Sequence, residues 1–276
     1  MDAYEIRTAE RFDAADIVAV LSAADLGSRQ LAFLKRTLAS PRCRTLMGWD
    51  GGRPVATALA IRLDGATAWL ANVAVVPDHQ RRGLGRTLVD RSLAWLLDGG
   101  AQTVSLLATE AGRGLYARLG FVPDGVVYDK YRIPARLAPK GPGTVRPGTL
   151  TEALRLDAEA TGEGRAPLLE PFAKRVVVAG AAADGDGARG YALALPWGGG
   201  PVVARDDEVA HALWWHVYGQ AAGARWAVPD SNAAARALAR RYGLGADGVS
   251  VRMRYGPGPT APGPAAIWAA YSLAAG

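Results

Sequence analysis

A nine-residue apolar run, AWLANVAVV at residues 68–76, narrows the choice of fold more than any other part of this sequence. The run has the length of a β-strand, and apolar residues occupy both its odd and its even positions. A strand that is apolar on both faces has to be covered on both sides, as happens in sheets flanked by helices. The run therefore predicts an α/β fold in which this strand lies inside a central sheet.

Strands and helices alternate around this run. The patterns predict a strand at 4–9, helices at 11–24 and 28–38, a hairpin at 44–63, the strand at 68–76, a helix at 85–97, a strand at 103–109, a helix at 112–120 and strands after residues 121–123. This order, βααβββαβαβ, is typical of a mixed sheet flanked by helices.

The same order recurs in the second half of the chain. The patterns predict a strand at 144–149, helical segments over 150–179, strands at 189–196 and 200–205, a helix at 207–218, a strand at 224–229, a helix at 231–243 and a strand at 249–255. Aligning the halves on Gly120 and Gly243 sets LYARLGF beside LARRYGL, which indicates an internal duplication. We therefore expect two tandem domains, residues 1–135 and 148–276, joined by a Pro/Gly-rich linker at 136–147.

Charge and cysteine content exclude several classes of protein. The net charge of +6 lies mostly in residues 1–140, which hold 19 Lys and Arg against 14 Asp and Glu. Scattered arginines with few aromatic residues between them favour a small anionic ligand over nucleic acid. With no long apolar run and no basic, apolar leader, we expect a soluble, cytoplasmic protein that does not bind membranes. The single cysteine, Cys43, excludes an internal disulfide and a cysteine metal cluster.

The junction between the apolar strand and the next helix has the chemistry of a phosphate site. Gly83 and Gly85 stand at the start of the predicted helix, where backbone N–H groups have no partners within the helix. These donors and the positive end of the helix dipole attract phosphate oxygens, and glycine lets the backbone approach them. Arginines at 81, 82 and 86 add positive charge. The plainer interpretation is an ordinary strand-to-helix turn with solvated arginines.

Two motifs together resemble those of the GCN5-related N-acetyltransferases. The first is NVAVVPDHQRRGLGRTLV, in which Gln80, Gly83 and Gly85 occupy the family's Gln/Arg and Gly positions and Pro77 lies upstream. The second is LYARLGF, where a helix carries Tyr116 and ends at Gly-Phe. The resemblance covers residues 3–133.

This resemblance implies a cosubstrate, acetyl-CoA, and a set of residues that hold it. In the family the strand before the loop pairs with the pantetheine arm, its amides polarise the thioester carbonyl, and the loop amides hold the diphosphate. A tyrosine at the position of Tyr116 protonates the departing thiolate, and Thr109 stands where many relatives carry a cofactor-binding asparagine. By position, the strand residues are Val73, Ala74 and Val75, and the loop residues are Arg81, Arg82, Gly83, Leu84, Gly85 and Arg86.

The general base is left unassigned by the resemblance. Some relatives carry a glutamate twelve residues before the tyrosine, where this chain has Val104. Glu110, Asp64 and Asp25 remain as candidates, although each also suits a surface carboxylate, and the amine can lose its proton to water. We interpret His79 as a packing residue.

The second half lacks this chemistry. Asp206, Asp207 and Glu208 replace the glycine loop, and Ala239 stands where Tyr116 stands in the first half. The predicted function is direct acetyl transfer to a primary amine of a small molecule, without a metal, with a degenerate second domain that lines the acceptor pocket or serves only as a scaffold. An acetyl-CoA sensor without activity and a peptide N-acetyltransferase are the alternatives. We expect a monomer, with a homodimer as the second possibility.

Overall fold

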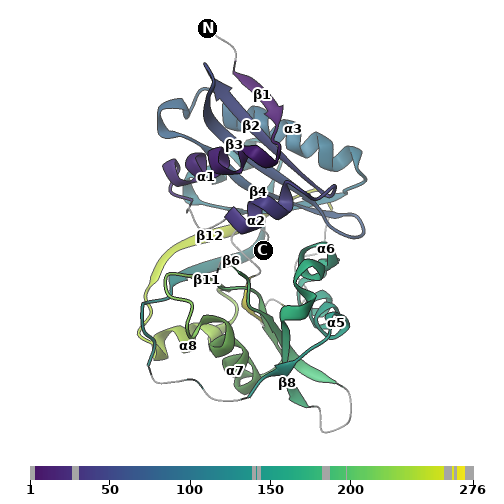
Figure 1. Cartoon of the computed structure of the whole chain (residues 1–276), viewed down its shortest axis with the longest axis vertical. Helices are drawn as coiled ribbons and strands as arrows, with labels where there is room; N and C mark the ends of the chain where they lie inside the picture. Colours follow the sequence, from purple (N-terminus) through teal and green to yellow (C-terminus); the bar gives the residue numbers. More distant parts are fainter. Residues whose placement is uncertain are drawn as a thin grey trace.

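The computed structural model has two lobes that follow the two halves of the chain (Figure 1). It describes residues 4–26, 31–138, 141, 144–181, 187–196, 198–257, 263 and 266–270. Residues 28–30 of a predicted helix and part of the predicted linker lie outside the described residues. Within them, no helix has both the length and the apolar character needed to span a bilayer.

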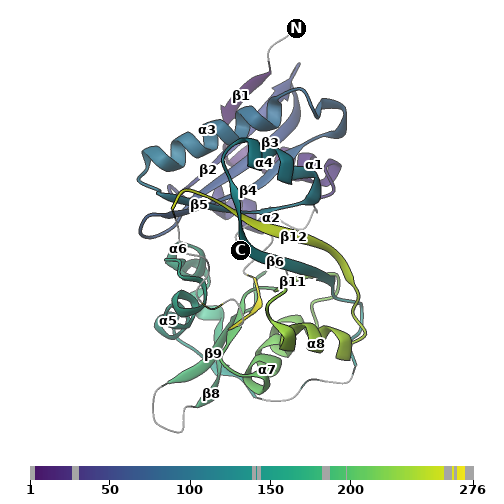
Figure 2. The ribbon, with the colours of Figure 1, turned by 180° about the vertical axis from the view of Figure 1, so that it is seen from behind.

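The first half contains the predicted order of elements. They are β1 (Glu5–Thr8), η1 (Arg11–Asp13), α1 (Ala14–Ala23), α2 (Leu31–Thr37), β2 (Cys43–Asp50), β3 (Arg53–Arg62), β4 (Thr67–Val75), η2 (Pro77–His79), α3 (Leu84–Asp98), β5 (Thr103–Ala108), α4 (Glu110–Arg118) and β6 (Val122–Arg132). Helices α1 and α2 lie on one face of the sheet, and α3 and α4 on the other (Figures 1 and 2). The apolar run at 68–76 is β4 and is covered on both sides, as predicted.

The second half repeats this order with two differences from the prediction: a strand replaces the end of a predicted helix, and a short last strand at residues 267–269 was not predicted. Its elements are β7 (Arg146–Pro147), α5 (Leu150–Thr161), α6 (Ala166–Leu169), η3 (Glu170–Arg175), β8 (Val176–Ala181), β9 (Ala188–Leu193), β10 (Val202–Ala204), α7 (Asp207–Tyr218), β11 (Arg225–Pro229), α8 (Ala233–Arg241), β12 (Ala246–Tyr255) and β13 (Ile267–Ala269). The prediction of helix up to residue 179 was wrong, because residues 176–179 belong to β8. Three consecutive valines favour a strand, and β8 pairs with β9 from Val176 opposite Leu193.

The two halves exchange their last long strands. The larger sheet has the order β1-β2-β3-β4-β5-β12-β6-β11, so β12 of the second half lies between β5 and β6 of the first. In turn, β6 pairs with β11 of the second half, with Tyr131 opposite Trp226. Figure 2 shows β6 and β12 running from one lobe into the other. One continuous sheet therefore joins the halves, and neither half completes it alone.

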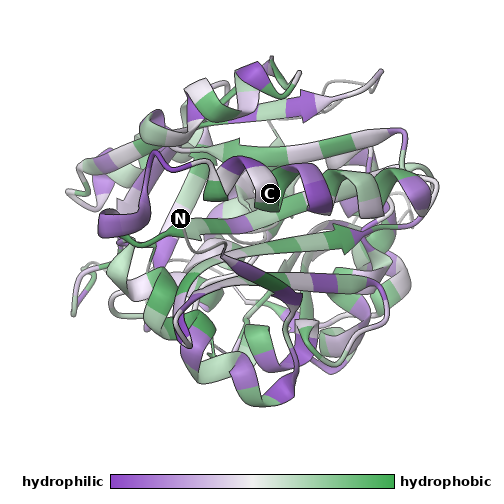
Figure 3. Ribbon diagram, turned by 90° about the horizontal axis from the view of Figure 1, so that it is seen from above, coloured by the Kyte–Doolittle hydropathy of each residue, from purple (hydrophilic) through white to green (hydrophobic). Residues whose placement is uncertain are grey.

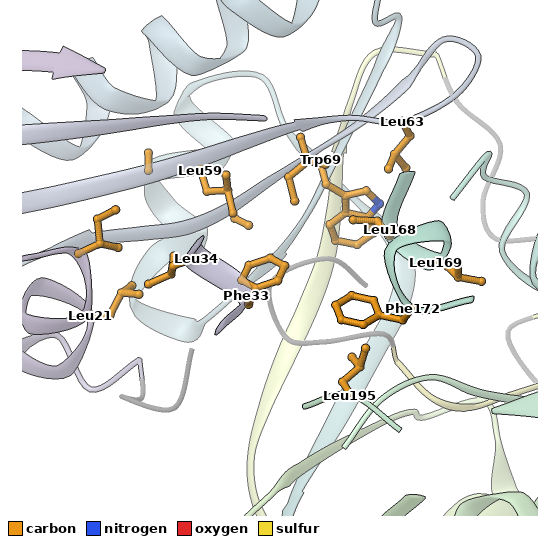
Figure 4. Packing of buried hydrophobic residues seen from close by; sticks show 14 of the residues in the cluster. Leu21, Phe33, Leu34, Leu59, Leu63, Trp69, Leu168, Leu169, Phe172 and Leu195 are labelled. Atoms are coloured by element: carbon orange, nitrogen blue, oxygen red, sulfur yellow. The ribbon is translucent and has the colours of Figure 1, made fainter. Parts of the chain in front are cut away.

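A second sheet, of order β13-β10-β9-β8-β7, belongs to the second half. Seen from above, hydrophobic residues follow the central strands, while hydrophilic residues mark the outer turns of the helices (Figure 3). One buried cluster crosses between the halves: Phe33 of α2 and Trp69 of β4 share it with Leu168 and Phe172 (Figure 4). Apolar burial and shared strands therefore both hold the lobes together.

A buried ionic network lies at the same junction. Arg252 of β12 donates to Glu163 Oε1 at 2.8 Å, and its Nε is 3.1 Å from Asp124 Oδ2. Glu163 also accepts from the indole nitrogen of Trp69 at 2.9 Å. The three charged side chains are each at most 6% exposed. The Arg252 guanidinium therefore neutralises two carboxylates that have little access to water.

Removing this guanidinium should weaken the whole molecule. Arg252→Met leaves Glu163 and Asp124 buried without this cation, so we expect the free energy of unfolding to fall by about 3 kcal/mol. Urea denaturation followed by circular dichroism measures this change. Arg240→Met removes the same charge from an exposed position of α8 and is expected to cost less than about 0.5 kcal/mol. Equal losses in the two variants would contradict the role given to the network.

Candidate functional site

Strands β4 and β5 diverge and open a gap in the larger sheet. They pair in parallel only at Thr67–Thr103, Ala68–Val104 and Trp69–Ser105, although β4 continues to Val75 and β5 to Ala108. A bulge in β4 accompanies the divergence, because Ala71 lies opposite Leu59 whereas Ala74 lies opposite Thr57. An extra residue in one strand bends that strand away from its neighbour. The edge of β4 from residue 70 onward is thus left without a strand partner on the β5 side.

The bulge contains Asn72, which the sequence analysis did not single out. Its φ of 49° is a left-handed conformation that asparagine tolerates better than most residues. The side-chain nitrogen of Asn72 is buried and has no hydrogen-bond partner in the part of the chain that the structure describes. Since a buried amide donor without a partner is costly, this nitrogen is a candidate donor to a ligand. The signal in the sequence was an asparagine inside an otherwise apolar strand.

The loop after β4 presents the start of α3 without a cap. Gln80 Nε2 donates to the carbonyl of Val75 at 2.9 Å and ties the loop to the end of the strand. Arg81 and Gly83 have φ values of 60° and 85°, so the chain turns through two left-handed residues before the helix. No described side chain caps α3, whose first intrahelical bond runs from Thr87 N to Gly83 O. The amides of residues 84–86 therefore have no partners within the helix.

The gap between β4 and β5, the loop after β4 and the start of α3 all open into one cavity of about 940 Å³. Nine of the predicted residues line it: Val73, Ala74, Val75, Arg81, Gly83, Gly85, Arg86, Thr109 and Tyr116. Arg82 and Leu84 do not. Leu84 is buried, and its methyl groups fill the space above Gly48, where a Cβ would lie 3.1 Å from Leu84 Cδ1. Asp25 and Asn72 line the same cavity. So do four residues of β6, β11 and β12, namely Lys130, Arg225, Asp247 and Ser250.

Thr109 and Tyr116 lie at opposite ends of α4. Thr109 caps the helix by accepting from Gly112 N at 3.3 Å, so its hydroxyl proton is still available to a ligand. The ring of Tyr116 packs edge-on against Phe121, with centroids 5.8 Å apart. Gly112 leaves room for this ring, because a Cβ there would lie 3.0 Å from Tyr116 Cε2. Burial raises the pKa of the Tyr116 phenol, so the group is protonated at neutral pH and can donate a proton.

Of the candidate bases, only Asp25 lines the cavity. Asp64 forms an ion pair with Arg42 at 2.9 Å, and Glu110 is exposed and pairs with Arg113 at 3.3 Å. Neither lines the cavity. His79 is buried, and its Nδ1 lies 3.0 Å from the hydroxyl of Tyr4, whose ring also packs against it edge-on. These contacts suit the expected packing role, and His79 also lines the cavity.

The corresponding place in the second half is filled by the chain itself. Strand β13 pairs with β10, with Ala269 opposite Val202, and Ala270 N donates to Ala227 O of β11 at 3.0 Å. β13 thus lies between β10 and β11, the counterparts of β4 and β5. At the next helix, Asp206 caps α7 by accepting from Val209 N at 3.0 Å. Both features that leave the first gap open, a free strand edge and an uncapped helix, are missing from the second among the described residues.

Cys43 and His211 both lie outside the lining of the cavity. Burial raises the pKa of Cys43 to about 11, and this residue lies on β2 and does not line the cavity. Among the described residues, no three His, Cys, Asp or Glu side chains are grouped so that they could hold a metal ion. His211 instead forms a 2.8 Å hydrogen bond with the hydroxyl of Tyr242.

The diverging parallel strands and the uncapped helix after them form one site in an α/β fold, and comparison with known proteins identifies the family. Residues 12–121 match the sequence model "Acetyltransferase (GNAT) family", and residues 153–264 match "Acetyltransferase (GNAT) domain". The chain belongs to the GNAT acetyltransferase family and contains two GNAT domains in tandem. No curated protein matches the sequence.

Two solved structures have the same fold over nearly the whole chain. One is "a putative acetyltransferase" from Pyrococcus horikoshii, with a TM-score of 0.83, 22% sequence identity, and coverage of 100% of this chain and 97% of that chain. The other is a GCN5-related N-acetyltransferase from Sphaerobacter thermophilus, with a TM-score of 0.68, 19% identity, and coverage of 95% and 99%. At these identities the likeness concerns the fold.

The two glycines of the loop should respond differently to alanine. Gly83 has a φ of 85°, so Gly83→Ala places a Cβ in a left-handed conformation and should destabilise the protein by about 1 kcal/mol. At Gly85 a Cβ would meet Val75 Cγ2 at 3.5 Å, an ordinary contact, and alanine favours the helix. Gly85→Ala is therefore expected to leave the melting temperature unchanged or raise it. A lower melting temperature for Gly85→Ala than for Gly83→Ala would contradict this assignment.

Proposed function

We propose that the protein transfers the acetyl group of acetyl-CoA to a primary amine of a small molecule, in the cavity between β4 and β5. The observation that carries the proposal is that a free strand edge, an uncapped helix start and a protonated tyrosine line one cavity. Membership of the GNAT family supports the same reaction class. The second GNAT domain supplies no second reaction centre in this proposal.

The residues of the cavity fit two polar parts of coenzyme A, the amides of the pantetheine arm and the diphosphate. The unpaired edge of Val73–Val75 offers backbone donors and acceptors to the amides of the pantetheine arm, like an added strand. The amides at the start of α3 suit the diphosphate, and Arg81 and Arg86 line the same space with positive charge. Asn72 and Thr109 add a side-chain N–H and a hydroxyl.

Acetyl-CoA supplies the acetyl group as a thioester. A backbone N–H on the edge of β4 donates to the carbonyl oxygen and stabilises the negative charge that develops there. As the amine nitrogen bonds to the carbonyl carbon and the C–S bond breaks, Tyr116 gives its proton to the sulfur. The amine proton leaves to water or to Asp25, which lines the cavity. Direct attack is favoured because Cys43, the only cysteine, lies outside the cavity.

The second half completes the acceptor pocket in this proposal, because Arg225, Asp247 and Ser250 line the same cavity. The exchanged strands and β11 supply this wall within a single chain. The proposal therefore includes a monomer as the active form.

Replacing Tyr116 tests the assigned proton donor. Tyr116→Phe keeps the ring and removes the proton, so kcat should fall by roughly 10²–10⁴ with little change in coenzyme A affinity. Release of free thiol in the presence of a panel of amines measures the rate. Tyr255→Phe is the matched control, because the Tyr255 ring also packs against Phe121, with centroids 5.6 Å apart, and does not line the cavity. Tight binding of acetyl-CoA without turnover of any amine would instead favour a sensor.

The difference between the halves predicts the number of coenzyme A sites. Isothermal titration calorimetry should give one site per chain, because β13 fills the second gap and Asp206 caps α7. Arg86→Glu reverses a charge at the start of α3 and should weaken binding about tenfold or more. Arg91→Glu, further along the same helix and outside the cavity lining, should change it much less. Two equivalent sites per chain would contradict the proposed assignment.

A further inference from the structure

One wall of the cavity consists of residues that the strand exchange brings together. Lys130 lies on β6, Arg225 on β11, and Asp247 and Ser250 on β12. The three strands are neighbours in the sheet, with Ala227 and Gly248 on either side of Lys130. Strand β12 pairs with β5 only from Val251 onward, where Val251 lies opposite Ala108 at the end of β5. The residues of β12 before Val251 lie past the end of β5, so β5 does not separate this wall from the gap between β4 and β5.

This wall lies on the face of the sheet opposite to Tyr116. Successive side chains of a strand point to alternate faces. On β12, Met253 belongs to the buried cluster of Tyr116 and helix α3, whereas Arg252 contacts Trp69 and Glu163 on the other face. Ser250 lies two residues before Arg252 and therefore points to the same face. Tyr128 of β6 pairs with Ser250, and Lys130 lies two residues further along β6, so Lys130 also points to this face.

Helices α1 and α2 cover the same face (Figure 1), and Asp25 after α1 lines the cavity from there. The cavity therefore passes through the gap between β4 and β5. The loop and α4 border one side of it, and the exchanged strands and Asp25 border the other. An acceptor that approaches from the second side would meet these residues first.

The wall carries two cations without close counter-charges. Neither Lys130 nor Arg225 has a carboxylate within 4.0 Å among the described residues. The charge of Asp247 acts on Lys130, but Asp247 is paired with Arg132 at 3.6 Å. Burial and, after it, the charge of Arg225 lower the pKa of Lys130, while Asp247 acts in the opposite direction. Two half-buried cations that repel each other beside an open cavity would gain from an anion bound between them.

We propose that Lys130 and Arg225 bind an anionic group of the acceptor, a carboxylate or a phosphate, so that the protein acetylates small amines that also carry such a group. The inference rests on the function proposed above and names its class of acceptor. The guanidinium of Arg225 offers paired N–H donors to two oxygens, and Lys130 adds a compact charge. Ser250 has a hydroxyl on the same wall, and Asp25, which borders the same side of the cavity, suits the amine end of such an acceptor.

Acetylated product analogues test this inference without needing turnover. N-acetylglycine, N-acetyl-O-phosphoethanolamine and the neutral N-acetylglycinamide are titrated into the protein, with and without coenzyme A, by calorimetry. At least one anionic probe should bind about tenfold or more tightly than the neutral one. Which anionic probe binds more tightly distinguishes a carboxylate from a phosphate acceptor.

Two variants and a control assign the preference to the wall. Lys130→Met and Arg225→Met should each weaken the anionic probe about tenfold and leave the neutral probe and coenzyme A unchanged. Both variants remove a half-buried charge, so we expect them to fold. Lys174→Met removes an equal charge from an exposed residue outside the cavity lining and should change no affinity.

The outcomes separate this inference from the function on which it rests. Equal affinity for anionic and neutral probes, or equal losses for both in the two variants, would overturn anion recognition by Lys130 and Arg225. Failure to bind coenzyme A or to release thiol would overturn the proposed function, and the affinities for the three probes are measured independently of that result.

Discussion

The backbone pairing of β12 with β5 on one side and β6 on the other is the interaction on which the rest of the molecule depends. Backbone N–H and C=O groups inside a sheet need partners, so withdrawing β12 would expose the edges of two strands at once. The pairing also carries Arg252 to Glu163 and Asp124, and Ser250 to the cavity. Sheet continuity, the buried ionic network and one cavity wall therefore have a single origin.

Local features of the chain were predictable from the sequence, whereas the sheet that each strand joins was not. The uncapped helix after Gly83 and the burial of β4 follow from residue types at fixed spacings. The alternating pattern of residues 249–255 predicts a strand, but it is equally compatible with either sheet, because pairing partners distant in sequence leave no local pattern. For the same reason the wall formed by Lys130 and Arg225 could not be predicted. The valines at 176–178 were misassigned because a short apolar run fits a buried helix and a strand alike.

The two copies of the fold solve the same structural problem in different ways. Diverging strands leave a free edge, and in the second copy β13 occupies it, with Ala270 N donating to Ala227 O at 3.0 Å. Side chains hold β13 there as well: Asn232 Nδ2 donates to Ile267 O at 3.0 Å, and Trp226 Nε1 donates to Trp268 O at 2.6 Å. Asn232 stands seven residues before Ala239, as Thr109 stands before Tyr116. A helix-cap position that lines the open cavity in one copy thus binds the chain itself in the other. Filling the gap with β13 removes the need for a ligand to satisfy that edge.

Because of the strand exchange, the two copies contribute different parts of the cavity lining. The diverging strands, the loop and Tyr116 all come from residues 67–116, whereas Arg225, Asp247 and Ser250 come from the second copy. Substitutions in the second copy can therefore alter one wall without moving the helix start or the bulge of β4. In a duplicated chain this arrangement lets the acceptor preference change while the groups proposed to hold coenzyme A stay fixed. The cost is that the two copies cannot separate, because the wall exists only while β6 and β12 remain exchanged.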